Sequence, residues 1–376
     1  MALPRWKASS AEPAEGADLV TAKPPLIASL STIQTLRGLA ALMVAIAHLH
    51  AVENRFGGTP LLGEWALAGF GGVDLFFVIS GFVMVWVTRA DQGKPAALPG
   101  FWFARLARIY PLWWLVLSAL VAVWMVKPDW VYASHESSPE IWKSYLLIPD
   151  KELPLHAVGW TLIHELWFYL AFGLMLLLPA RWFPAALAIW AIATAATAYV
   201  WPKPETPFVA LIRHPLTLEF ILGAAVGLLA QRRIFPAPRV MAQFGGFWMV
   251  LSALALRENA PAMFGEEWPR LFYFGIPAAL LVWGCVGLEH SGLKGPTWTV
   301  SLGDWSYALY LIHVPVFAAL GRLGAPLSQP GPLDNLILLV VALASALVAA
   351  WILHVGFDRP VQKLAAHVRG TRTIKG

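Results

Sequence analysis

The stretch IQTLRGLAALMVAIAHLH, residues 33–50, decides the class of fold, because its length and apolar character are those of a membrane-spanning helix. It nevertheless carries Arg37 and His48, and an ionisable side chain inside a membrane is costly enough to need a reason. Eleven residues of α-helix make about three turns plus roughly 20° and rise about 16 Å. We therefore expect both side chains on one face, about half a bilayer apart, along a polar path through a helix bundle.

The whole chain has the composition of a polytopic membrane protein. Of its 376 residues 58% are hydrophobic and 13% are charged, and it holds 20 Trp and 20 Phe, a balance that excludes an ordinary soluble domain. Its net charge of +5 is explained by the placement of basic residues relative to a membrane, so we expect the lipid bilayer and no nucleic acid as a partner. The single cysteine, Cys285, excludes an intrachain disulfide.

Apolar runs of about 17 to 25 residues predict an all-α fold, a polytopic transmembrane helix bundle with about ten membrane-spanning helices. The expected spans are 33–52, 66–88, 107–126, 158–178, 183–201, 209–230, 240–256, 270–289, 297–320 and 334–356. Lys and Arg are concentrated in the segments on the side of the two termini, so the positive-inside rule places both termini in the cytoplasm. We expect a flexible cytoplasmic tail at 1–32, one membrane domain at 33–356 and a basic cytoplasmic tail at 357–376.

The first span carries two candidate functional groups. His48, in the outer half of the span, has a neutral imidazole that can accept a proton near physiological pH, or it can be a histidine that is hydrogen-bonded inside the bundle. The guanidinium of Arg37 can bind phosphate or carboxylate, or it can reach the cytoplasmic interface from the first turns of the helix. The ionisable groups of the spans show no metal-ligand spacing, so we expect no metal.

A second candidate region is FWFARLARIYPLWW, residues 101–114, at the cytoplasmic boundary. Arg105 and Arg108 are three residues apart and therefore share a helix face. Their guanidinium groups suit an anionic, phosphate-bearing ligand. Positive-inside anchoring of the helix explains the same charges.

The segment GWTLIHELWFYL, residues 159–170, brings polar groups into the fourth span. Glu165 and Tyr169 lie one turn apart, and Trp160 lies about one turn before Glu165. The carboxylate can orient a histidine or bind a sugar hydroxyl, with Trp160 and Tyr169 beside the substrate. It can equally tie this helix to a neighbour.

Two further blocks hold polar residues for substrate binding or for structure. In GGVDLFFVISGF, residues 71–82, we expect Asp74 to pair with an arginine or a histidine. In LGDWSYALYLIHVPV, residues 302–316, the side chains of Ser306, Tyr310 and His313 fall on neighbouring faces. We expect His313 to be a hydrogen-bonding residue and not a catalyst.

Five blocks in this order, IQTLRGLAALMVAIAH, GGVDLFFVISGF, RLARIYPLWW, WTLIHELWFYL and LGDWSYALYLIH, resemble the integral-membrane acyltransferases of family 3, which O-acylate polysaccharides and related glycans. The resemblance covers about residues 31–365. The opening block and the compact length are most similar to the exopolysaccharide O-acetyltransferases of the ExoZ type. Two positions depart from the family: 164 is usually not histidine, and Asp358 stands where glutamate before Arg-Pro is common.

The resemblance implies that acetyl-CoA, or another acyl-CoA, is the donor and that a cell-surface glycan is the acceptor. It implies that Arg105 and Arg108 take part in donor binding or in a functional cytoplasmic contact, and that His48 and Arg37 are essential. We expect Arg37 to lie along the donor channel and His48 to act as a base or as a nucleophile. Glu165 would hold the imidazole tautomer of His48 or bind the acceptor. We expect a bacterial inner-membrane protein that works beside polysaccharide-synthesis machinery and lacks a large extracytoplasmic SGNH domain.

Two other functions use the same residues. A transporter of a glycan or a lipid-linked sugar would use the buried charges as a relay and would leave an acyl thioester intact. A scaffold for a polysaccharide synthase would tolerate loss of both His48 and the arginine pair.

Overall fold

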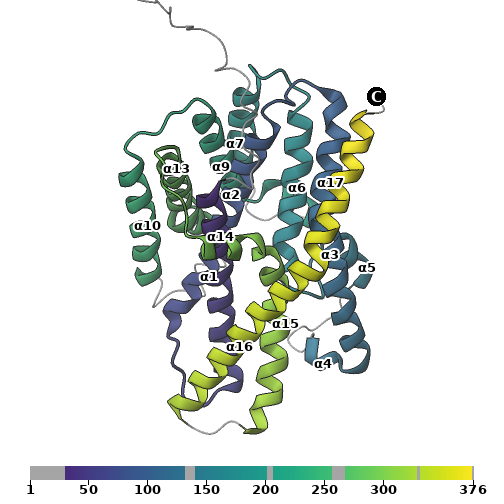
Figure 1. The fold of residues 1–376 in the computed structure, drawn as a ribbon, viewed down its shortest axis with the longest axis vertical. Coiled ribbons are helices and arrows are strands. Elements are labelled where there is room, and N and C mark those ends of the chain that lie inside the picture. The colour runs from purple at the N-terminus through teal and green to yellow at the C-terminus, as the bar shows by residue number, and fades with distance from the viewer. Residues whose placement is uncertain (1–29, 132–139, 201–205, 256–266, 328–330, 375–376) are drawn as a thin grey trace, which may run out of the picture.

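The computed structural model describes residues 30–131, 140–200, 206–255, 267–327 and 331–374. The expected N-terminal tail therefore lies almost entirely outside the described residues. Within them the regular secondary structure is entirely helical, with no strand, which confirms the predicted all-α fold. Figure 1 shows the long helices packed side by side as a bundle.

The helices of the N-terminal half are α1 (Ser31–Phe56), η2 (Glu64–Phe70), α2 (Gly71–Thr88), η3 (Pro95–Ala97), α3 (Leu98–Val126), α4 (Pro128–Val131), α5 (Ile141–Leu146), α6 (Gly159–Met175) and α7 (Phe183–Val200). The C-terminal half contains α8 (Pro207–Arg213), α9 (Thr217–Gln231), α10 (Pro238–Ala255), α12 (Glu267–Arg270), η5 (Leu271–Gly275), α13 (Ile276–His290), α14 (Thr297–Asp304), α15 (Ser306–Gly324), η6 (Ala325–Leu327), α16 (Pro332–Leu353), η7 (His354–Asp358) and α17 (Arg359–Ile374). Both η5 and η7 are π-helical turns.

Within the described ranges, 8 helical segments are long and apolar enough to cross a membrane, so the chain is a multi-pass membrane protein. Two of the ten expected spans are not among them. The helix α6 has 17 residues, slightly fewer than the roughly 20 that span a bilayer upright, and α10 begins with the polar residues Arg239 and Gln243. The ten expected spans therefore include two segments, α6 and α10, that are the weakest candidates for crossing the membrane.

The expected span 297–320 is wrong as a single helix. The chain breaks at Trp305 between α14 and α15, where the Ser306 hydroxyl donates to the carbonyl of Gly303 at 2.8 Å. A local hydrogen bond of this kind satisfies the backbone where the helix ends. Of the two expected roles of Ser306, substrate binding or structure, this hydrogen bond favours the structural one.

The expected span 209–230 is also divided, into α8 and α9. The break falls at His214 and Pro215, because proline lacks an N–H and pushes the preceding residue out of the helical region. The residues expected to form the basic C-terminal tail are helical as far as the structure describes them, since α16, η7 and α17 continue one another to Ile374. Figure 1 shows α17 running beside α3 to the end marked C.

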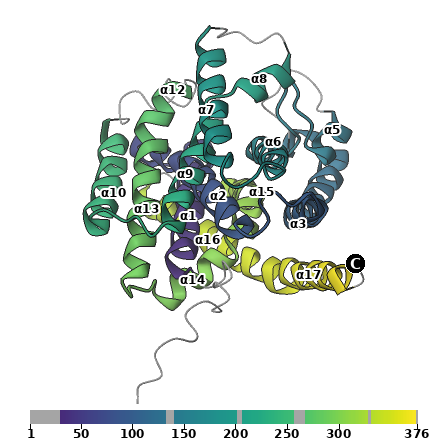
Figure 2. The ribbon, with the colours of Figure 1, turned by 90° about the horizontal axis from the view of Figure 1, so that it is seen from above.

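The centre of the bundle depends on a close approach of two helices. Viewed from above in Figure 2, α1, α2 and α9 occupy the middle, with α10 and α13 on one side and α3 and α6 on the other. A Cβ atom on Gly223 would lie 1.9 Å from the carbonyl oxygen of Val78, and one on Gly81 would lie 1.9 Å from that of Phe220. Only glycine fits at these two positions, where the backbones of α2 and α9 are in contact.

The start of α1 is fixed by a side chain from a distant helix. Glu289 of α13 accepts hydrogen bonds from the backbone N–H and the hydroxyl of both Ser31 and Thr32. The first N–H groups of a helix have no partner within the helix, and a carboxylate there also offsets the positive end of the helix dipole. This contact sets the position of α1, and with it that of Arg37 and His48.

Candidate active site

A cavity of about 130 Å³ opens between α1, α2, α3, α6 and α15. Its polar lining consists of Arg37, Ser80, Arg105, Arg108, Thr161, Glu165, Tyr169, Tyr307 and Tyr310. The rest of the lining is apolar. Three of the four arginine and histidine side chains singled out in the sequence as functional therefore meet on one cavity, although they come from two helices. The fourth, His48, does not line it.

One end of the cavity carries the arginine pair, and its two members differ. Arg105 places its guanidinium carbon 5.9 Å from the ring centre of Tyr169, and its buried Nε has no hydrogen-bond partner among the described residues. Arg108 is bound to Asp358 of η7, with Nη1 3.2 Å from the carboxylate, and lies over the ring of Tyr307. Arg105 is therefore the member with unused capacity to bind an anion.

Arg37 lies along the same cavity. Its Nη1 donates to the Gln34 side chain at 3.4 Å, a long contact. The interpretation that Arg37 merely reaches the membrane surface is not supported, because its side chain faces a cavity inside the bundle. Arg37 is thus the third arginine in the lining of the cavity, with Arg105 and Arg108.

The middle of the cavity holds Glu165 in a compact polar group. Its Oε1 accepts hydrogen bonds from the hydroxyls of Ser80, at 2.9 Å, and Tyr169. Ser80 comes from α2 and the other two from α6. Glu165 thus joins these two helices at the cavity wall, and its hydrogen bonds within the described residues go to Ser80 and Tyr169 and not to His48.

The far end of the cavity is closed by Tyr310 and Thr161. Their hydroxyls are 2.7 Å apart, and the Tyr310 hydroxyl also donates to the carbonyl of Val158 at 3.2 Å. Immediately behind this pair, the ring of His313 lies 6.0 Å from that of Tyr310. The hydroxyl pair therefore separates the cavity from a group of histidines.

That group contains His48, whose neighbour is His313. The Nε2 atom of His313 lies 3.2 Å from the Nδ1 atom of His48, and each Nδ1 atom also faces the carbonyl four residues earlier in its own helix, at 3.0 Å. The ring of Phe70 packs edge-on against His48 at 4.9 Å. The side chain hydrogen-bonded to His48 is thus His313, whereas the sequence suggested Glu165 as the group that orients this histidine.

A third histidine, His156, lies in the loop before α6 and is buried. Its ring stacks on Trp113 at 5.6 Å, and its Nε2–H donates to the carbonyl of Leu311 at 2.8 Å. Burial lowers the pKa of His156 to about 4, with a smaller contribution from the nearby His48. It therefore stays neutral near physiological pH.

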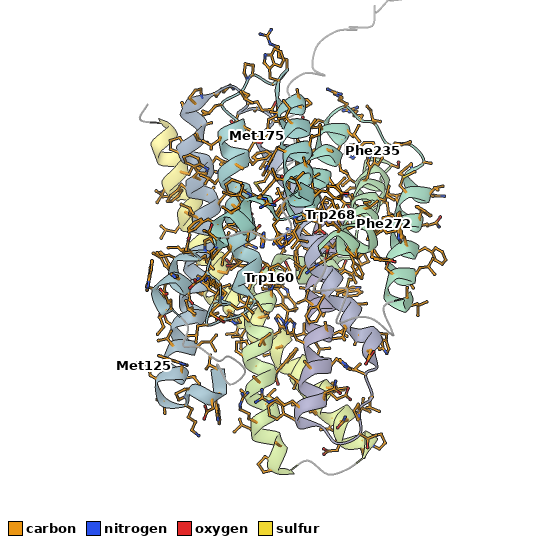
Figure 3. All side chains as sticks on the ribbon, turned by 180° about the vertical axis from the view of Figure 1, so that it is seen from behind. Met125, Trp160, Met175, Phe235, Trp268 and Phe272 are labelled. Carbon is orange, nitrogen blue, oxygen red and sulfur yellow. The ribbon has the colours of Figure 1, made fainter. Side chains whose placement is uncertain are left out.

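Asp74 and Trp160 lie behind the cavity wall and not on it. Both Asp74 oxygens pair with Arg270, at 2.9 and 3.0 Å, so the predicted arginine pairing of Asp74 is present. The guanidinium of Arg270 lies 5.5 Å from the ring of Trp160, which Figure 3 places at mid-height between the labelled Met175 and Met125. Asp74, Arg270 and Trp160 therefore form a buried group next to the cavity and do not line it.

The same wall contains groups that sequence reasoning left without a role. Glu219 of α9 is completely buried, and its two oxygens have no hydrogen-bond partner within 3.5 Å among the described residues. His164, the residue that departs from the family, packs its ring 4.4 Å from that of His214. Across the described part of the chain, no group of three or more His, Cys, Asp and Glu side chains is placed to hold a metal ion.

Several partners were not predicted from the sequence. Arg270 lies at the start of an apolar run, where an arginine resembles an interfacial anchor. The only sequence signal for Ser80 was its place inside the block GGVDLFFVISGF, and the only one for Asp358 was its departure from the family. Their partners are 85 and 250 residues away.

Comparisons with known proteins identify the family of the chain. The profile of a family described as "Acyltransferase domain" matches residues 30–355. Acyltransferase MdmB of Streptomyces mycarofaciens is 28% identical over 93% of this chain and 96% of its own length. The exopolysaccharide production protein ExoZ of Rhizobium meliloti is 28% identical over 72% of this chain and 83% of its own.

A third relative is larger than the matched region. Peptidoglycan O-acetyltransferase OatA of Listeria monocytogenes is 27% identical over 53% of this chain, which is 28% of its own length. No solved structure matches the chain.

Proposed function

Because the chain belongs to the membrane acyltransferases of family 3, we propose that it transfers an acyl group, acetyl in the simplest case, from acyl-CoA to a hydroxyl of an exopolysaccharide or another cell-surface glycan. The observation that carries this is the layout of one path. The cavity is lined by Arg105, whose buried Nε has no hydrogen-bond partner among the described residues, and by the Thr161–Tyr310 hydroxyl pair. The ring of His313, which is hydrogen-bonded to His48, lies 6.0 Å from that of Tyr310.

The donor end of this path is the Arg105 end. Coenzyme A carries phosphates, and arginine binds phosphate by charge-assisted, often bidentate, hydrogen bonds. The apolar lining between Arg105 and Tyr310 suits the pantetheine arm and the acyl chain. Arg37 lies along this route and adds positive charge to the channel.

The acceptor end is the His48 side. The Nε2 atom of His48 takes the proton of the acceptor hydroxyl, and the oxygen forms a bond to the thioester carbonyl carbon. The carbon–sulfur bond then breaks, and the departing thiolate receives the proton from His48. The products are the O-acyl glycan and free coenzyme A, and the histidine returns to its starting state.

An acyl-histidine intermediate is the other mechanism open to the same ring, with His48 Nε2 attacking the thioester carbon first. The two differ in kinetics. An acyl-histidine route predicts a burst of one free coenzyme A per protein in the absence of acceptor, whereas the general-base route predicts none.

The proposed orientation follows the basic residues. The Arg105 end, α17 and both termini face the cytoplasm of a bacterial inner membrane, where acyl-CoA is made, and His48 faces the opposite half of the bilayer. The glycan would be acylated as it is exported, beside the polysaccharide-synthesis machinery.

The test uses purified protein in lipid nanodiscs with radiolabelled acetyl-CoA and a de-acetylated exopolysaccharide. We expect label in the polysaccharide and free coenzyme A in equal amount. His48→Ala should reduce transfer by about 100- to 10,000-fold, the usual contribution of a general base, whereas His290→Ala on α13 should not. A transporter would leave the thioester intact, and normal transfer by His48→Ala would rule out the assigned base.

A further inference from the structure

We propose that His313 is a positioning residue that fixes the tautomer of His48, so that the Nε2 atom of His48 is left without a proton and ready to accept one. This inference rests on the proposed function, because it gives His313 a part in the same reaction. It is carried by the hydrogen bonds of the two rings and by the burial of His313.

The protonation of His313 follows from its surroundings. The ring is 0% exposed, and its Nδ1 lies 3.0 Å from the carbonyl oxygen of Leu309. A carbonyl oxygen only accepts, so this Nδ1 carries the hydrogen. A neutral imidazole has one N–H, and its Nε2 is then a bare acceptor, which points at His48 at 3.2 Å.

The protonation of His48 follows in turn. Its Nδ1 faces two acceptors, the carbonyl oxygen of Val44 at 3.0 Å and the bare Nε2 of His313 at 3.2 Å. The Nδ1 atom must therefore carry the hydrogen, which the two acceptors share. The remaining nitrogen, Nε2, is bare and makes no hydrogen bond to any described residue, and the side chain of His48 is only half-buried.

The ring of His48 is also held in place by packing. Phe70 meets it edge-on at 4.9 Å with an interplanar angle of 89°, and His313 meets it at 4.8 Å and 69°. Because both neighbours restrict rotation of the ring, the bare Nε2 keeps one direction. His156 is the further titratable group near this pair, and its Nε2–H is used by Leu311.

The contact with His313 becomes stronger when His48 is protonated. Once Nε2 of His48 accepts a proton, the ring is an imidazolium and its Nδ1–H donates to His313 as a charge-assisted hydrogen bond. This is the part played by the third group in base-and-orienter arrangements of other enzymes. Both ring nitrogens of His313 are engaged, Nδ1 by the carbonyl of Leu309 and Nε2 by His48, so His313 acts through His48 and not on the donor.

Two substitutions separate this role from simple filling of space. The amide of glutamine reaches the position of a histidine Nε2, so His313→Gln can keep an acceptor for His48. The amide of asparagine reaches only the position of Nδ1, so His313→Asn keeps the bond to Leu309 and loses the one to His48. We expect His313→Asn to lower kcat about 10- to 100-fold with the donor KM unchanged, and His313→Gln to recover most of kcat.

The matched control is His290. Its Nδ1 makes the same bond to the carbonyl four residues earlier, Val286, at 3.0 Å, and it lies outside the cavity lining. We expect His290→Asn and His290→Gln to keep the wild-type kcat. Normal activity of His313→Asn would overturn the proposal, as would an equal loss of kcat in folded His313→Asn and His313→Gln.

A second readout does not depend on acyl transfer. Nitrogen NMR of histidine-labelled protein in nanodiscs, with the His48 signals assigned by their loss in His48→Ala, should show a protonated Nδ1 and a bare Nε2. In His313→Asn the two nitrogens should move toward averaged values. A protonated Nε2 in the wild type would contradict the proposal directly, whereas absence of transfer with the expected NMR signals would refute only the proposed function.

Discussion

Arg108 and Asp358 join the third helix to the C-terminal end of the bundle across 250 residues of sequence, with Nη1 3.2 Å from Oδ2. The carboxylate is 2% exposed and also contacts His354 at 3.0 Å and the amide of Gln362 at 3.4 Å. The amide of Gln362 in turn donates to the carbonyl of Ala107 at 2.9 Å. The position of the cavity arginine Arg108 therefore depends on the π-helical turn η7 and on α17.

Asp358→Asn should weaken this junction. Removing the charge leaves Arg108 with only its contact over the Tyr307 ring, and because Arg108 is itself one-quarter exposed, we expect a loss of about 1–2 kcal/mol, below the cost of breaking a fully buried pair. The unfolding temperature in detergent should fall by several degrees, and the donor KM should rise. Asp358→Glu, which restores the residue common in the family, should stay close to wild type. Equal effects of both substitutions would argue against the ion pair.

Arg105→Gln should act on donor binding and leave the fold intact. Arg105 makes no hydrogen bond within the described residues that the substitution would remove, and a hydrogen bond to a charged group contributes roughly 1.5–3 kcal/mol. We expect the donor KM to rise about 10- to 100-fold, measured as initial rates over a range of acetyl-CoA concentrations. Arg239→Gln, at an exposed position on α10, is the control and should leave KM unchanged. An unchanged KM in Arg105→Gln would show that the phosphates bind elsewhere.

Gly223→Ala should destabilise the bundle. The new Cβ would lie 1.9 Å from the carbonyl oxygen of Val78, so α2 and α9 must separate, at a cost of about 1–3 kcal/mol or more. Thermal unfolding in detergent should shift to lower temperature. The matched change Gly246→Ala, where the nearest atom to the added Cβ is 4.0 Å away, should cause no loss. If both alanine variants unfold like wild type, the close contact of α2 and α9 is refuted.

His156 should make the fold less stable in mild acid. Burial lowers its folded pKa to about 4 from about 6.5 in the unfolded chain, so the unfolded state binds the proton more readily. The contribution of neutral His156 to the free energy of unfolding is therefore complete above pH 6.5. It is lost as the pH falls toward 4, and the loss is about 2 kcal/mol at pH 5.

His156→Gln can keep the bond to Leu311 and does not titrate. The difference in unfolding temperature between pH 7 and pH 5 should therefore be smaller in this variant than in wild type. His290→Gln should retain the wild-type difference. An equally steep loss in His156→Gln would assign the acid sensitivity to other groups.

Much of the fold could be predicted from the sequence, because a continuous run of apolar residues is enough to identify a helix that crosses a membrane. The all-α class and most of the spans follow from windows of about 20 residues. The sequence did not predict the local breaks inside two of these spans, at Trp305 and at Pro215, or that α16 continues through η7 into α17. Hydropathy does not report these features, since it sums composition and ignores hydrogen bonding.

The site was predicted in part. Arg37, Arg105, Arg108, Glu165, Tyr169 and Tyr310 do line one cavity. The sequence left open whether Glu165 serves the reaction or ties its helix to a neighbour, and it gave His313 a hydrogen-bonding role without naming a partner. Spacing along one helix does not identify such partners, because Ser80 and His48 lie on other helices.

By itself, the sequence determined that this protein crosses the membrane many times, that it resembles the acyltransferases of family 3, and that Arg37 and His48 share a helix face. These properties depend on hydrophobicity, residue order and the 3.6-residue turn, all of which are local. Only the tertiary structure decided which groups meet: His48 with His313, Glu165 with Ser80, Asp74 with Arg270, and Arg108 with Asp358. The physical reason is that the ionisable groups of these pairs must find partners inside the bundle, and helix packing selects among partners up to 265 residues apart.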